Sequence, residues 1–178
     1  MRRRSVLLAI AVLAAGLLVA SLAGAAGGKK NLKADRLTGY QENPDVSTAA
    51  TGSFTATIDD DAQTISYELS YSGIEGGTVS ASHIHFGKRA VNGGVSAFLC
   101  SGGDKPACPA TEGSVTGVID AADIIGPTAQ GIGVGSFDEL VAAMRAGHTY
   151  VNVHSTGADP AWPGGEIRAQ INDRDANN

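Results

Sequence analysis

Apolar and polar side chains alternate along much of this chain. Between residues 65 and 71, Ile, Tyr, Leu and Tyr alternate with Ser, Glu and Ser, and residues 53–58 show the same period of two. This period predicts β-strands that turn one face to the core and the other to water. The acidic residues 59–61 separate the two segments, which indicates a solvated turn and a β-hairpin. That triplet lacks the ligand spacing and the glycine of a calcium-binding loop.

Six further segments show strand patterns between turn signals, namely residues 31–40, 79–86, 95–100, 115–119, 150–155 and 166–171. One helix is predicted over residues 137–146. Ser136 and Glu139 have the spacing of an N-terminal capping box, and Gly147 suits the position after the helix. About eight short strands with one short helix are typical of a mainly β domain, built as an antiparallel sandwich or barrel.

The first 25 residues have the layout of a secretory signal peptide. Residues 2–4 are arginines, residues 6–23 form an uncharged apolar run, and residues 23–25 offer the small side chains of a cleavage site. A retained membrane anchor is the alternative, because the apolar run approaches the length of a bilayer span. We expect cleavage, since small and Gly-rich residues follow directly, and hence a secreted or cell-envelope protein.

Composition sharpens this picture. The 178-residue chain has a net charge of −5, and residues 1–25 carry three arginines and no acidic residue, so cleavage leaves 153 residues with a charge of −8. An acidic surface argues against nucleic acid as a partner.

Cys100 and Cys108 enclose a short loop that contains Gly and Pro. In an exported chain we expect them to form a local disulfide that contributes roughly 2–3 kcal/mol at most.

Three of the four histidines lie on two of the predicted strands. His83 and His85 point to one face of the strand over residues 79–86. His154 shares a face of the strand over residues 150–155 with Tyr150 and Asn152. If these strands are neighbours, three imidazoles converge, and imidazole nitrogens suit copper or zinc. The candidate metal ligands are therefore His83, His85 and His154.

A structural polar network is the alternative to a metal site. Asn152, Glu166 and Arg168 lie on polar faces of predicted strands, where they would either orient the ligand imidazoles or satisfy them as hydrogen-bond partners. His148 follows the predicted helix and is expected at the surface. A serine hydrolase is disfavoured, because no G-x-S-x-G turn is present.

Four segments in order along the chain resemble the motifs of the chordin-type CHRD domain. The family patterns are L-x-G-x-x-E-x-P-P-V, H-I-H-x-G, Y-V-N-V-H-T and G-E-I-R-G-Q. This chain matches them from Leu37, from His83, from Tyr150 and from Gly165, with the departures Asp45 for Pro, Ser155 for Thr and Ala169 for Gly. The matches extend over about residues 31–172, which is nearly the whole mature chain.

The resemblance implies an immunoglobulin-like antiparallel β-sandwich of about eight strands with one short helix. It divides the chain into a signal peptide (1–25), a CHRD domain (26–172) and a polar tail (173–178). It supplies no catalytic activity. We therefore expect an exported, non-catalytic binding module of the envelope or extracellular space, with no membrane span after signal cleavage and with its partner and cofactor left open.

The H-x-H strand is also similar to that of copper/zinc superoxide dismutase, another β-sandwich. Four histidines are too few for the two-metal site of that enzyme, so the similarity is an analogy at the level of the fold. The alternative prediction is therefore a metalloprotein that binds copper or zinc, with or without redox activity.

Overall fold

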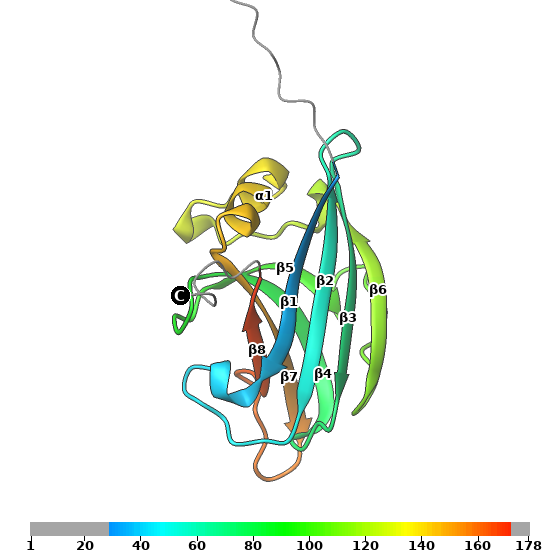
Figure 1. Cartoon of the computed structure of the whole chain (residues 1–178), viewed down its shortest axis with the longest axis vertical. Helices are drawn as coiled ribbons and strands as arrows, with labels where there is room; N and C mark the ends of the chain where they lie inside the picture. The colour runs from blue at the N-terminus through cyan, green and yellow to red at the C-terminus, as the bar shows by residue number, and fades with distance from the viewer. Residues whose placement is uncertain (1–28, 172–178) are drawn as a thin grey trace, which may run out of the picture.

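A computed structural model describes residues 29–171 (Figure 1). Eight strands, one α-helix and three 3-10 helices follow one another in this part of the chain. In order they are β1 (Lys30–Thr38), η1 (Gly39–Gln41), β2 (Thr51–Asp59), β3 (Thr64–Ser72), β4 (Gly77–Phe86), β5 (Gly94–Cys100), β6 (Gly113–Ile119), η2 (Ala121–Asp123), η3 (Thr128–Gln130), α1 (Phe137–Arg145), β7 (Thr149–Gly157) and β8 (Ile167–Gln170). All eight predicted strands and the predicted helix are present.

The eight strands form one antiparallel sheet in the order β5-β4-β7-β8-β1-β2-β3-β6, which curls into a nearly closed barrel (Figure 1). Side chains join the two ends of the sheet, between the edge strand β5 and β3, which is the neighbour of the other edge strand β6. Tyr67 of β3 donates a hydrogen bond of 2.6 Å to the carbonyl oxygen of Leu99 in β5. The mainly β class is therefore correct, whereas the immunoglobulin-like sandwich is not confirmed, because the described strands form one sheet.

The predicted hairpin supplies one wall of the core. Phe54 of β2 lies opposite Leu69 of β3, and Ile58 lies opposite Ile65. All four side chains are fully buried, while the residues between them face outward. The alternation in the sequence thus becomes an inner apolar face and an outer polar face, as a half-buried sheet requires.

The helix α1 packs its apolar stripe on the core through Leu140 and Met144. Gly147 follows it with a φ of 75°, which fits the predicted left-handed residue after a helix. The predicted capping box is wrong. The side chain of Ser136 makes no capping hydrogen bond, and the Glu139 carboxylate accepts from the amide of Gly133 instead.

The predicted disulfide between Cys100 and Cys108 is confirmed. It joins the end of β5 to the segment that leads into β6. The predicted signal peptide and polar tail fall on residues 1–28 and 172–178, outside the described residues. Within residues 29–171, none of the helices has the length and apolar character needed to span a bilayer.

Candidate functional site

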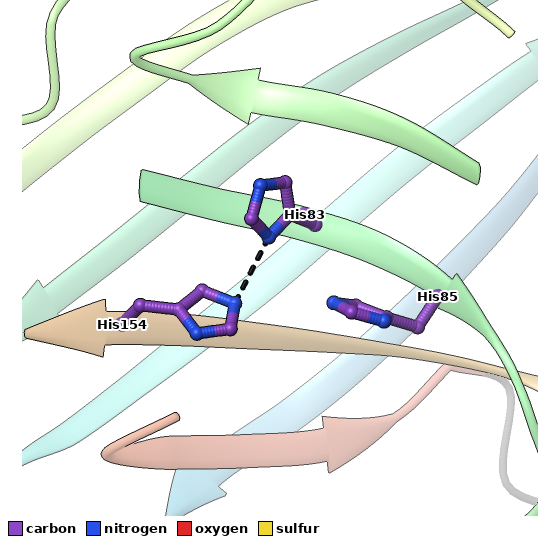
Figure 2. A group of neighbouring side chains, drawn as sticks. All are labelled: His83, His85 and His154. Atoms are coloured by element: carbon purple, nitrogen blue, oxygen red, sulfur yellow. Dashed lines mark hydrogen bonds between the residues drawn. The ribbon is translucent and has the colours of Figure 1, made fainter. Parts of the chain in front are cut away.

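The three strand histidines meet on the outer face of β4 and β7 (Figure 2). Their neighbours in sequence, Ile84 and Val153, are fully buried in the core, so the alternation turns the imidazoles to the opposite side of the sheet. The two strands pair antiparallel, with His83 opposite Asn152. His154 is two residues further along β7, which places it diagonal to His83.

The imidazoles lie close enough to share one small ligand. One ring nitrogen from each of the three histidines lies within 4.8 Å of the others. The Nδ1 atom of His83 and the Nε2 atom of His154 are 2.9 Å apart (Figure 2). The ring centroids of His83 and His85 are separated by 5.4 Å. The structure therefore brings together all three of the histidines that the sequence singled out.

Backbone carbonyl groups determine which nitrogen of each ring carries a proton. Nδ1 of His85 lies 2.9 Å from the carbonyl oxygen of Gly93, and Nδ1 of His154 lies 3.0 Å from that of Pro163. A carbonyl oxygen only accepts, so both Nδ1 atoms donate. In the neutral ring Nε2 then keeps its lone pair. His83 consequently donates from Nδ1 to the Nε2 of His154.

The Nε2 atom of His85 has no such partner. It is buried and no partner stands at full hydrogen-bond geometry to it, although the side chain of Asn152 is close enough to the ring to raise its pKa, and His85 as a whole is only 8% exposed. In Figure 2 one nitrogen of this ring points toward the other two histidines. A buried acceptor without a donor costs about 1–3 kcal/mol.

Burial keeps the three rings neutral. It lowers the pKa of His83 to about 3, and the neighbouring His154 and His85 lower it further. Burial also lowers the pKa of His85 to about 4, although hydrogen bonds to Gly93 and to the side chain of Asn152 oppose the shift. The pKa of His154 is lowered by burial as well, against the hydrogen bond to Pro163. Neutral imidazole is the form that binds a metal ion.

Aromatic rings enclose the histidines on two sides. Phe98 of β5 meets the ring of His83 edge-on, with centroids 4.6 Å apart. Tyr150 stacks on His85 at 4.8 Å with nearly parallel planes. The guanidinium carbon of Arg168 lies 3.3 Å from the centroid of Tyr150, close enough for a cation–π contact. The site is thus partly shielded from water, with a positive charge one ring away.

The predicted polar network is only partly where the sequence put it. The carboxylate of Glu166 accepts from the hydroxyl of Thr48 at 2.8 Å and from the amides of Glu75 at 2.8 Å and Gly76 at 3.1 Å. Arg168 donates to the carbonyl oxygens of Lys88 and Val91, both at 3.1 Å. Within residues 29–171, neither side chain bonds a histidine. Glu166 instead joins one of the loops that cover the site to the turn between β3 and β4, and Arg168 holds a second of these loops.

Those loops comprise residues 39–50, 87–93 and 157–165, and we refer to them as the covering loops. The second and third supply the carbonyl groups that bind His85 and His154. Asn152 donates to the carbonyl of Gly164 at 3.5 Å, while its Oδ1 is buried without a partner. This agrees with the prediction that Asn152 belongs to the polar face.

Glu42 is the site residue that the reasoning on strands missed. It lies on the first covering loop and is only 6% exposed. Its Oε1 atom is buried without a partner. A Cβ atom on Gly165 would stand 2.4 Å from that oxygen and 2.8 Å from Nδ2 of Asn152, so Glu42 lies beside Asn152. Its place in the first of the four motifs was the available signal.

His148 lies outside the cluster. It follows α1, is exposed, and bonds to neighbouring segments through its backbone rather than through its ring. This agrees with the expectation that it is a surface residue. His148 consequently offers a matched control for substitutions of the other three histidines.

The CHRD domain family matches residues 34–171. Neither the curated proteins nor the solved structures contain a match to this chain. The matched segment includes β4, β7 and β8 with all three clustered histidines, and it spans most of the 178 residues. This chain belongs to the CHRD domain family.

Proposed function

We propose that this chain is an exported, non-catalytic CHRD binding module and that its ligand is a copper or zinc ion held by His83, His85 and His154. The observation that carries the proposal is the convergence of one ring nitrogen from each of the three histidines within 4.8 Å. The buried Nε2 of His85 has no partner at full hydrogen-bond geometry, and the side chain of Asn152 approaches the same ring. Three neutral imidazole nitrogens are a common ligand set for these metals.

The hydrogen bonds from Nδ1 support the same assignment. A ligand histidine almost always donates its other ring nitrogen to a carbonyl or carboxylate, which fixes the tautomer and the orientation of the ring. His85 and His154 do so with Gly93 and Pro163. Only His83 would have to change, because its Nδ1 proton lies between it and His154. Moving that proton to Nε2 would free the third ligand atom without altering the charge of the ring.

A purely structural network is the competing function. Such a network would pair each buried nitrogen with a protein group, since a half-satisfied network is less stable than a filled one. His83 and His154 satisfy each other. His85 leaves its acceptor open, and this difference favours a ligand over a closed network.

Metal content measures the proposal directly. Tag-free protein, exposed to copper or zinc and then desalted, should retain one ion per chain. His85→Ala and His154→Ala should lose that ion while thermal unfolding shows a folded domain. His148→Ala should retain it. A folded wild-type protein that binds neither metal, or a His85→Ala variant with unchanged stoichiometry, would refute the metal function.

Export is the second part of the proposal. It is supported by the apolar run at residues 6–23, by the small residues at 23–25, and by the disulfide, since disulfides persist mainly in oxidising compartments. The intact mass of protein recovered from outside the cytoplasm should correspond to a chain that begins near Ala26, with Cys100 and Cys108 oxidised. A retained N-terminus or two free thiols would contradict this part.

A further inference from the structure

The candidate ligand set carries no negative charge. It contains three imidazoles and, within residues 29–171, no carboxylate or thiolate joins the group. Both cysteines are bound in the disulfide. A metal ion that enters this site would keep its full positive charge unless it brought an anion with it.

The surroundings do not supply that anion. The guanidinium of Arg168 lies on the far side of Tyr150 from His85, so it adds a positive charge to the region. The carboxyl group of Glu42 lies beyond Asn152 and shares its environment with Arg168. Burial raises the pKa of Glu42 to about 7, which further reduces its negative charge. The nearest ring neighbours, Phe98 and Tyr150, are neutral.

Such an environment penalises a divalent ion more than a monovalent one. The cost of moving an ion out of water grows with the square of its charge, so a divalent ion costs about four times as much for the same radius. Imidazole nitrogens suit copper as well as zinc. Cu(I) is the biologically common copper state with a single charge, and it accepts two or three neutral nitrogen ligands.

The spacing of the ligand atoms points the same way. With metal–nitrogen bonds of about 2.0–2.1 Å, two ligand nitrogens are about 3.3 Å apart in a tetrahedral site and about 4.1 Å apart across a linear one. Here one pair is 2.9 Å apart and all three atoms lie within 4.8 Å. A flat, T-shaped metal site combines short and long separations between ligand nitrogens. The three imidazoles would therefore have to move less to form such a site than to form a tetrahedral one.

We infer that the histidine cluster selects Cu(I) over Cu(II) and Zn(II). This inference rests on the proposed metal function and adds the oxidation state. The rings of His85 and His154 are the widest pair, with centroids 6.0 Å apart, and the ring of His83 lies nearer to each of them. Phe98 and Tyr150 flank the rings of His83 and His85. The CHRD module then holds copper in its reduced form.

Competition titrations test the selectivity. Tag-free protein is titrated under nitrogen against the bicinchoninate complex of Cu(I), and in separate experiments against chromophoric chelators of Cu(II) and of Zn(II), all at one pH. The dissociation constant for Cu(I) should be at least tenfold lower than those for Cu(II) and Zn(II). A tenfold preference over Cu(II) places the bound couple about 59 mV above the aqueous couple.

The outcomes separate this inference from the function on which it rests. Zn(II) or Cu(II) binding as tightly as Cu(I), and lost in His85→Ala, would overturn the selectivity and leave the metal function standing. Failure of all three ions to bind the folded protein would overturn both. Cu(I) bound equally well by His85→Ala would also overturn both, since the metal would then lie elsewhere.

A charge introduced beside the cluster gives a second test. Phe98 is partly exposed and touches His83, so Phe98→Asp offers a carboxylate to the ion, and Phe98→Leu is the uncharged control. Phe98→Asp should shift the preference toward Zn(II) by about tenfold relative to Cu(I), while Phe98→Leu keeps the wild-type order. An equal shift in both variants would contradict the argument from charge.

Discussion

Two parts of the barrel share one sequence pattern and use it differently. In the β2–β3 hairpin, apolar residues such as Phe54 and Leu69 are buried and the intervening polar residues face outward. In β7 and β8 the apolar residues are also buried, and so are most of the polar ones between them, including His154 and Arg168. The difference lies in the covering loops, which lie over the second region.

This contrast shows where the domain accepts an energetic cost. Burying polar groups is tolerated when each finds a partner, and isolated ones cost about 1–3 kcal/mol. Within the described chain, the hairpin residues 51–72 contain no buried side-chain nitrogen or oxygen atom that lacks a partner. The covered region contains several, among them His85 Nε2, Asn152 Oδ1 and Glu42 Oε1. The hairpin therefore stabilises the fold without such costs, whereas the covered strands carry the unpaired polar atoms on which the proposed function rests.

The largest effect is expected in the hairpin. Phe54→Ala removes a fully buried ring from the core and should lower the free energy of unfolding by about 3–5 kcal/mol. Urea denaturation measures this loss. The remaining folded protein should bind metal with unchanged stoichiometry, because Phe54 is on the opposite wall from the histidines. A loss below about 1 kcal/mol would show that the hairpin is not the main support of the core.

Removing the carboxylate that ties down one of the covering loops should be almost as severe. Glu166→Ala leaves the donors of Thr48, Glu75 and Gly76 without their acceptor, so we expect a loss of about 3 kcal/mol. Glu68→Ala, an exposed carboxylate on β3, is the control and should change stability by less than about 0.5 kcal/mol. Equal effects in the two variants would remove the distinction between the covered and the open face.

Acid should destabilise the metal-free protein through the histidines. In the unfolded chain they titrate near pH 6.5, whereas in the fold the pKa is about 3 for His83 and about 4 for His85. Between these values the unfolded state binds more protons, so stability falls as the pH drops from about 6.5 toward 4, by about 2–3 kcal/mol for each of these two rings. Denaturation at a series of pH values measures the slope.

His148→Ala should keep this pH dependence, because His148 lies outside the cluster. In the presence of saturating metal, stability should fall more steeply as the pH decreases. Protons in the unfolded state and metal in the folded state compete for the same histidine nitrogens. Stability that does not change between pH 6.5 and pH 4 would contradict the burial of neutral histidines.

A second pH-dependent effect concerns Glu42. Burial raises its pKa from the ordinary 4.5 to about 7, against the attraction of Arg168. Between those values the folded state binds the extra proton, so this residue stabilises the fold at low pH and loses that contribution as the pH rises through 7. Glu42→Gln should therefore be more stable than the wild type by about 3 kcal/mol at pH 8, and equal to it near pH 4.

Thermal unfolding of both proteins at pH 4 and pH 8 measures the difference. A Glu42→Gln variant that is less stable than the wild type at pH 8 would indicate that the electrostatic attraction between Glu42 and Arg168 outweighs the cost of burial.

The periodic part of the sequence was sufficient to predict the strands. Residues 65–71 and 150–155 show the period of two, and both lie within observed strands, β3 and β7. The sequence pattern did not predict that the covering loops lie over β7 and β8, because these loops have no periodicity. The carbonyls of Gly93 and Pro163 are backbone groups that almost any residue would supply. These carbonyl groups bind the histidines only because the fold places them next to the rings.

The histidines were predictable for a different reason. His83 and His85 alternate with Ile84 on one strand, so their common face follows from the sequence, and only the pairing of β4 with β7 was needed to add His154. Ser136 shows the opposite case. Its spacing to Glu139 matches a capping box. The carboxylate of Glu139 instead accepts a hydrogen bond from the amide of Gly133, a contact that the local sequence does not encode.

Anomalous diffraction from crystals grown with copper under reducing conditions tests the central claim most directly. We predict one peak per chain, bonded to Nδ1 of His83 and to Nε2 of His85 and His154, each at about 2.0 Å. The bonds from His85 to Gly93 and from His154 to Pro163 should remain as they are now. A peak elsewhere, for example at His148, or an unchanged hydrogen bond between His83 and His154 with no peak beside it, would contradict the account.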